Sequence, residues 1–281
     1  MAEISIILPT LRKEDALKRI KEFEMTNGNI DYEIVVISPF YIEEKKVKQI
    51  LEKTPQGVNA AMDKGYEIAS AHYVCWWSDA ASPTQNCLLN MINFLKIKHP
   101  PFIGTFRIKN IHGRELSQWK AYEKLYACWG CASKETIDSV GGLFDPIFHS
   151  YFADPDLGLR VWERGGAVEV CPNAYIIINR IPGDKFRKFH ENKYFQNDKE
   201  KFFNRWHHKL GKSIKKDFYQ VIKPVFEYEE VVNIFPFFLR PLILKLCDFY
   251  YTHSQLRENY FLRKIWEIIR DLYYCFKNSK N

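Results

Sequence analysis

Asp154, Asp156 and Arg160 stand close together in the sequence, separated by one proline and a few apolar residues. Carboxylates at such spacing act as general bases or bind cations, and arginine binds phosphate or holds a carboxylate in place. The same pattern is typical of a helix start, with Asp154 as cap, Pro155 in the first helical position and Asp156 in the first turn. A capped helix and a reactive site are both open on these residues alone.

A further carboxylate, Asp79, follows the apolar run 73–77 and precedes Pro83. Ligands bind beyond the carboxyl ends of the strands in an open α/β sheet, so Asp79 is a candidate ligand-binding residue. The alternative interpretation is a turn residue.

The first half of the chain alternates strand patterns with helix patterns, and these elements must position the candidate residues. Strands are predicted at 4–8, 32–37 and 73–77, and helices at 13–24, 42–51 and 59–69. Continuous apolar strands separated by helices indicate a parallel sheet covered on both faces. We therefore expect an α/β fold.

Length and composition are those of a globular protein. The chain has 281 residues and a net charge of +7, which is long enough to bury a large core. Its seven cysteines are odd in number, which indicates reduced thiols and a cytoplasmic location. The N-terminus lacks the features of a signal peptide, and no run has the length and purity of a membrane span.

The positive charge is concentrated after Arg180, whereas residues 1–179 are slightly acidic. Residues 256–276 have the pattern of an amphipathic basic helix. Two interpretations fit this helix: packing against the preceding domain or a second subunit, and peripheral attachment to an anionic membrane surface. No nucleic-acid-binding motif accompanies it, so nucleic acid is not an expected partner.

Several short motifs occur in a fixed order along about residues 3–210. They are Ile-Ile-Leu-Pro-Thr10, Glu33-Ile-Val-Val-Ile, Gln56-Gly57-Val-Asn59, Ser78-Asp79, Val140-Gly-Gly-Leu-Phe-Asp145, Tyr151-Phe-Ala-Asp154-Pro-Asp156 and Gly165-Gly166. This ordered set resembles the family 2 type of GT-A glycosyltransferases. The resemblance implies a Rossmann-like three-layer α/β/α domain over residues 1–225, and we expect a helical extension over residues 226–281.

The resemblance also implies an activity. It is the inverting transfer of a sugar from a nucleotide-diphosphate sugar to a hydroxyl of a glycan or lipid-linked acceptor, as in the synthesis of a capsule or lipopolysaccharide chain. Asp154 corresponds to the family's catalytic base, and Asp156 is a second catalytic candidate. Asp79 corresponds to the second aspartate of the Asp-x-Asp motif that binds Mg²⁺ or Mn²⁺. Trp77 replaces the first aspartate, so the motif is weakened.

The remaining site residues also follow from the resemblance. The nucleotide-binding candidates are Pro9, Thr10, Arg12, Ser38, Asn59, Ser78 and Asp79. The candidates for acceptor or diphosphate binding are Trp129, Gly141, Gly142, Arg160 and Arg180. Arg180 stands near the place of a metal-binding histidine of many relatives, where it either substitutes for charge at the diphosphate or is a solvated strand-end residue.

A second function class stays open. A GT-A scaffold that has lost catalysis would act as a docking protein for a membrane or a partner. The expected partners are a nucleotide-diphosphate sugar, a glycan or lipid-linked acceptor, an anionic membrane surface and a second copy of the chain. The expected location is the cytoplasm, with peripheral attachment to the inner face of the membrane.

Overall fold

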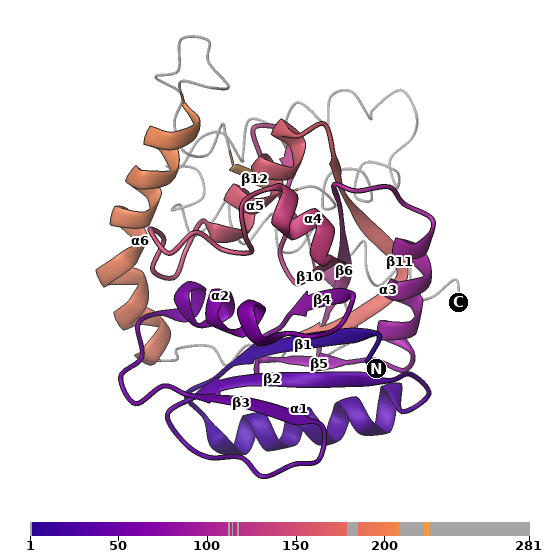
Figure 1. Ribbon diagram of the computed structural model, residues 1–281. Coiled ribbons are helices and arrows are strands. Elements are labelled where there is room, and N and C mark those ends of the chain that lie inside the picture. The colour runs from indigo at the N-terminus through magenta and orange to yellow at the C-terminus, as the bar shows by residue number, and fades with distance from the viewer. Residues whose placement is uncertain are drawn as a thin grey trace.

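A mixed nine-stranded sheet forms the centre of the computed structural model (Figure 1). The structure describes residues 2–111, 113, 115–116, 118–178, 185–207 and 222–224, with the backbone alone for 185–192 and 222–224. The strands of this sheet are β1 (Ile4–Pro9), β2 (Tyr32–Ser38), β3 (Val47–Leu51), β4 (Tyr73–Trp76), β5 (Ala81–Pro83), β6 (Phe102–Asn110), β7 (Glu115–Leu116), β10 (Gly130–Ser133) and β11 (Ala167–Ile178).

The strand order is β3-β2-β1-β4-β10-β6-β11-β5, with β7 beside β6. The first four strands are parallel to one another, and β6 is parallel to β11. β10 is antiparallel to both of its neighbours, β4 and β6. The predicted parallel sheet is therefore present at one side, and β10 makes the whole sheet mixed.

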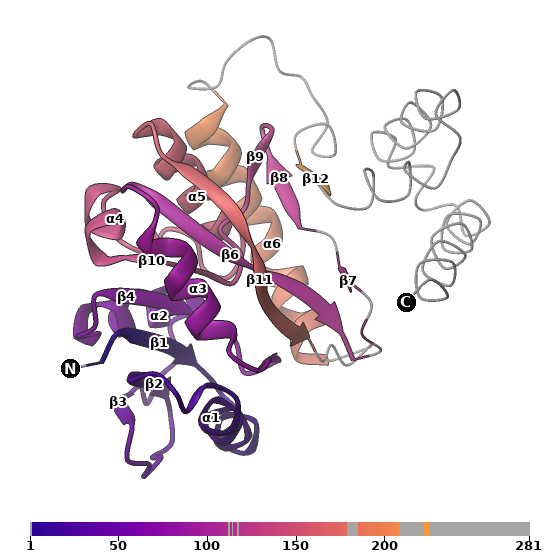
Figure 2. The same ribbon diagram turned by 90° about the vertical axis from the view of Figure 1, so that its right-hand side faces the viewer.

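Helices cover both faces of this sheet, which confirms the expected three-layer α/β/α fold (Figure 1). They are α1 (Lys13–Asn27), α2 (Val58–Ile68), α3 (Cys87–Lys96), α4 (Lys134–Ser139), α5 (Ala153–Glu163) and α6 (Lys185–Trp206). Buried residues of α1 and α3 join one core cluster, and those of α2, α4, α5 and α6 join the other. A small sheet of β8 (Trp119–Ala121), β9 (Lys124–Leu125) and β12 (Ile222–Pro224) lies at one side (Figure 2).

The predicted helix at 42–51 is wrong. The second half of this segment is strand β3, which pairs parallel with β2 from Ile34↔Val47 to Ser38↔Leu51. The amide of Gln49 also donates to Ser38 Oγ at 2.8 Å. Backbone pairing with the free side of β2 outweighs the modest helix preference of a charged segment, because the pairing satisfies the hydrogen-bonding groups of both strands.

Several expectations fall outside the described residues. They concern Arg180, the basic helix at 256–276 and the extension over residues 226–281, so the predicted domain boundary stays a prediction. In the part of the chain that the structure describes, no helix has both the length and the apolar character to cross a bilayer.

Candidate active site

Thr10, Arg12 and Asp79 form one hydrogen-bonded group at the carboxyl ends of β1 and β4. Thr10 Oγ1 donates to Asp79 Oδ2 at 2.7 Å. Arg12 donates from Nη2 to Oδ1 at 2.6 Å and from Nε to Oδ2 at 3.3 Å. β1 and β4 are parallel neighbours, so their carboxyl ends lie side by side and bring residues far apart in sequence together.

The Trp77 side chain belongs to the core. It is fully buried, its ring packs edge-on against Phe23 and Phe106, and its Nε1 donates to the carbonyl of Ala81 at 2.8 Å. The position of the first aspartate of an Asp-x-Asp motif is thus a packing position in this chain. A carboxylate there would be buried among aromatic rings, which is unfavourable without a partner.

Helix α5 begins two residues earlier than the sequence indicates. Its first residue is Ala153, and its cap position is Phe152, which makes no side-chain hydrogen bond to the helix end. The expectation that Asp154 caps the helix is therefore wrong, because Asp154 lies inside the first turn. Its carboxylate does not cap the helix, and the structural role left to it is the favourable position of an acidic residue in the first turn.

The surroundings of the Asp154 carboxylate suit a general base. Within the described residues, one side chain donates to it, the Cys128 thiol, with Sγ 3.4 Å from Oδ2. Burial raises the pKa of Asp154 to about 6, while the hydrogen bond from Cys128 acts in the opposite direction. A carboxyl group with a pKa near the working pH combines a sizeable ionised fraction with useful basicity.

The strand register places Cys128 at the same sheet edge as Asp79. β10 is antiparallel to β4, with Cys131 opposite Cys75 and Ser133 opposite Tyr73. The residues just before β10 therefore lie beside those just after β4. Because Cys128 contacts Asp154, the start of α5 is brought to the edge that carries Asp79.

Backbone strain also collects around the Cys128–Asp154 contact. Trp129 has φ = 42° and Phe152 has φ = 65°, values in the left-handed region that favours glycine. Each costs on the order of 1 kcal/mol or more, and such strain is concentrated at functional sites. Trp129 is half-buried beside this contact and packs against the core, so its role toward an acceptor stays a prediction.

Asp156 and Arg160 are buried structural partners. Asp156 is fully buried and accepts from Arg160 Nε at 2.9 Å, Arg205 Nη1 at 3.0 Å and Trp206 Nε1 at 2.8 Å. The other nitrogens of Arg160 donate to the carbonyls of Val140, Gly142 and Leu143. These contacts leave no exposed carboxylate oxygen for a substrate proton.

We therefore revise two expectations: Asp156 as a second catalytic residue and Arg160 as a diphosphate ligand. Both side chains are committed to holding the loop around Gly141 and Gly142. The two glycines have φ = 86° and φ = 105°, a conformation that L side chains rarely adopt, so the turn itself explains their presence.

Helix α6 fastens the segment that leads into α5, and the sequence patterns did not reveal this. Asp198 is fully buried and accepts from the backbone N–H groups of His149, Ser150 and Tyr151 at 2.9 to 3.1 Å. Arg205 adds an ion pair to Asp145 at 2.6 Å. The available signal was Asp198, a carboxylate that the fold buries on α6. Its backbone partners are about fifty residues away in sequence, so the sequence pattern does not pair them.

Two nucleotide-binding candidates have buried, bonded side chains. Ser38 donates to the carbonyl of Phe40 at 2.7 Å, and Asn59 Nδ2 donates to the carbonyl of Phe148 at 2.9 Å. These contacts assign both side chains to loop support, and we revise their expected role. Pro9 and Ser78 are half-buried at the Asp79 edge, so their nucleotide contact stays a prediction.

The residues around Asp79 do not fit a divalent cation well. Mg²⁺ and Mn²⁺ bind oxygen ligands that have unused lone pairs, and Asp79 already accepts three hydrogen bonds. No cluster of three or more histidine, cysteine, aspartate or glutamate side chains in the described residues is arranged to hold a metal. We therefore derive no catalytic step through a metal.

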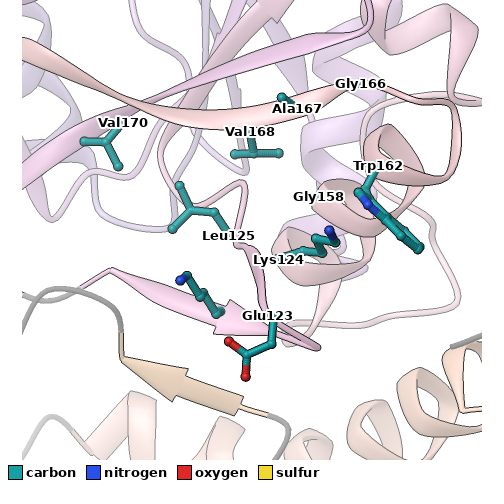
Figure 3. Close-up of a pocket in the computed structure, with 10 residues that line it drawn as sticks. Glu123, Lys124, Leu125, Gly158, Trp162, Gly166, Ala167, Val168 and Val170 are labelled. Atoms are coloured by element: carbon teal, nitrogen blue, oxygen red, sulfur yellow. The ribbon is translucent and has the colours of Figure 1, made fainter. Parts of the chain in front are cut away.

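A cavity of about 400 Å³ lies between β9, α5 and β11 (Figure 3). Leu125, Gly158, Trp162 and Val168 are among its lining residues, and Lys124 Nζ lies 4.6 Å from the ring centroid of Trp162. A helix rises about 1.5 Å per residue, so Trp162 is roughly 12 Å along α5 from the turn that carries the candidate base. The Trp162 end of the cavity therefore lies about two helical turns away from Asp154.

Comparisons with solved structures support the three-layer α/β/α fold described above. The structure of GalNAc-T7 with UDP, GalNAc and Mn²⁺ matches with a TM-score of 0.52 and 11% identity, over 75% of this chain and 53% of that one. The structure of S. aureus TarS 1-349 with UDP-GlcNAc matches with a TM-score of 0.50 and 14% identity, over 92% of this chain and 74% of that one.

A second structure of TarS 1-349 matches over 99% of this chain and 91% of that one, with a TM-score of 0.50 and 11% identity. The chain thus spans about half the length of the GalNAc-T7 structure and most of TarS 1-349. No family model and no curated protein matches the sequence. Over most of its length the chain has the fold of GT-A glycosyltransferases, which confirms the expected fold class.

The Cys128–Asp154 contact leads to a testable pH dependence. In a reaction with Asp154 as the base, only the ionised carboxylate accepts a proton, so the expected kcat/KM for that reaction falls about tenfold per pH unit below about pH 6. Replacing Cys128 by Ala removes a donor to the ionised form, which raises the pKa of Asp154 further. We expect the acidic limb to move upward by roughly 0.4 to 0.7 pH units, the equivalent of a weak hydrogen bond.

The control for this shift is Cys128→Ser, which keeps a donor of similar size and should hold the limb near its wild-type position. The measurement is the pH profile of kcat/KM for the three proteins. An identical profile for the Ala variant would contradict the role of the thiol.

Proposed function

We propose that this protein transfers a sugar from a nucleotide-diphosphate sugar to a hydroxyl group of a glycan or lipid-linked acceptor, with inversion at the anomeric carbon. The observation that carries the proposal is the environment of Asp154. Its carboxylate is free of helix capping, has a pKa of about 6 and lies at the sheet edge that also carries Thr10, Arg12 and Asp79.

The transfer step needs a base and a neutralised leaving group. Asp154 takes the proton of the acceptor hydroxyl as its oxygen forms a bond to the anomeric carbon. The bond from that carbon to the diphosphate breaks, and the diphosphate leaves with the electron pair. The developing negative charge is stabilised by charged donors at the Asp79 edge, and Asp154 then loses its proton to solvent.

Two similar structures support a nucleotide-sugar donor. The TarS 1-349 structure holds UDP-GlcNAc, and the GalNAc-T7 structure holds UDP, GalNAc and Mn²⁺. A role in surface polysaccharide synthesis, such as a capsule or lipopolysaccharide, and attachment of residues 226–281 to an anionic membrane surface belong to the same proposal. The cation of the GalNAc-T7 structure is not carried over, because the donor set at Asp79 fits it poorly.

Calorimetric titration with UDP, GDP, CDP and dTDP tests the donor class. We expect micromolar binding of one of these nucleotides, because the fold presents a charged group at the edge where such ligands bind. Lysozyme is a suitable control protein for non-specific heats. If none of the four binds, the transferase proposal fails, and the chain is better described as a docking scaffold without catalysis.

A further inference from the structure

We propose that the guanidinium of Arg12, anchored on Asp79, neutralises the donor diphosphate in the place of a divalent cation. The inference rests on the proposed function and concerns the same site. It makes Asp79 a positioning residue for Arg12, rather than a metal ligand.

The first step of the argument is the occupancy of the Asp79 carboxylate. Arg12 binds both of its oxygens, at 2.6 and 3.3 Å, and the Thr10 hydroxyl occupies Oδ2 at 2.7 Å. The Asp79 side chain is only 11% exposed and has three hydrogen bonds, which hold it in place, whereas the Arg12 side chain is 46% exposed and solvent screens its charge in part. A cation that coordinates Asp79 must first displace a two-point guanidinium contact.

The second step concerns the neighbouring position. A carboxylate at position 77 would supply the missing ligand, but Trp77 fills that position and is fully buried between Phe23 and Phe106. The core therefore excludes the pair of carboxylates that a two-aspartate site requires. One aspartate that is already paired with an arginine makes a weak metal site.

The third step concerns what Arg12 can still bind. Its side chain is 46% exposed, and guanidinium has five N–H donors in a planar fork that matches phosphate oxygens. Asp15 also contacts Nε at 3.2 Å, but Asp15 is 43% exposed. An ion pair of that kind contributes little, so a diphosphate can displace Asp15 while Asp79 keeps the guanidinium in place.

The variants predict changes in opposite directions. Arg12→Gln removes the charge, and we expect nucleotide binding to weaken roughly 10- to 100-fold, as for the loss of charge-assisted hydrogen bonds. Arg12→Lys keeps the positive charge but lacks the planar fork of donors. We expect its nucleotide affinity to lie between that of the wild type and that of Arg12→Gln. Asp15→Asn removes a competitor for the guanidinium and should strengthen binding roughly two- to fivefold. Lys18→Gln is the matched control for charge, because Lys18 is exposed on helix α1, which begins directly after Arg12.

The experiment is calorimetric titration of the full chain and these variants with the four nucleoside diphosphates, with Mn²⁺ and again with EDTA. Thermal unfolding of each variant checks that the fold is intact. We expect the affinity of the wild type to change less than threefold between Mn²⁺ and EDTA, and Arg12→Gln to bind weakly in both.

Three results would overturn the inference. Binding that EDTA abolishes and Mn²⁺ restores would show a metal at this site, while the proposed transferase function survives. Equal affinity of Arg12→Gln and Lys18→Gln would show that Arg12 does not contact the diphosphate. Absence of binding to the wild type under both conditions would reject the proposed function, and this inference with it.

Discussion

Replacing Asp154 with Asn is expected to lower kcat by 10²- to 10⁴-fold while leaving nucleotide affinity unchanged. That range is the usual contribution of a positioned general base, and a carboxamide of the same shape cannot accept the acceptor proton. Because Asp154 does not contact Thr10, Arg12 or Asp79 in the structure, the site of the diphosphate stays intact. The measurements are the steady-state rate of sugar transfer and the Kd of the nucleotide.

The stability of the Asp154→Asn protein gives a second readout. Burial raises the pKa of Asp154 above its ordinary value, so ionisation of this group opposes folding as the pH rises through that pKa. The amide removes this cost, and we expect an unfolding temperature equal to or slightly above that of the wild type at neutral pH. Asp31→Asn, at an exposed position, is the matched control. Full activity of Asp154→Asn would exclude Asp154 as the base.

The second large effect is expected at Asp156, and it concerns stability in place of catalytic rate. We expect Asp156→Asn to lower the free energy of unfolding by about 3 kcal/mol, since removing one partner of a buried ion pair leaves the other charges without compensation. The amide would also present N–H donors to Arg160 and Arg205, which are donors themselves. Urea unfolding of the variant beside the wild type measures the change.

At a temperature where Asp156→Asn is still folded, we expect most of its transfer activity to remain. The contrast with Asp154 is the decisive point: one aspartate should control rate without stability, and the other stability without a comparable loss of rate. A variant at position 156 with wild-type stability and a large fall in kcat would return Asp156 to the catalytic residues.

The sequence alone was informative about local pattern and motif order. The strands at 4–8, 32–37 and 73–77 and the helices at 13–24 and 59–69 are present, because their apolar residues recur with the period of each element. The α/β class followed from the alternation of these elements, and the three-layer α/β/α domain followed from the family resemblance of the ordered motifs. The segment 42–51 failed because its pairing with β2 is a tertiary contact that local preference does not contain.

The individual roles within the site were decided by tertiary structure. From sequence, Asp154 is the first candidate for the base and Asp156 the second, and Arg160 suits a phosphate as well as an aspartate. The fold buries Asp156 against Arg160 and Arg205 and leaves Asp154 with the Cys128 thiol. Neighbours in a helix point in different directions, so they meet different surroundings.

Long-range contacts account for the rest. Thr10 and Asp79 are 69 residues apart, and Asp198 meets its backbone partners across 47 to 49 residues. The sequence by itself supplies carboxylates and arginines suited to phosphate chemistry, at the spacings described. The parallel pairing of β1 with β4, the antiparallel β10 and the anchoring of α6 decided which of them meet, because hydrogen bonds and ion pairs act only between groups that the fold brings within a few ångströms.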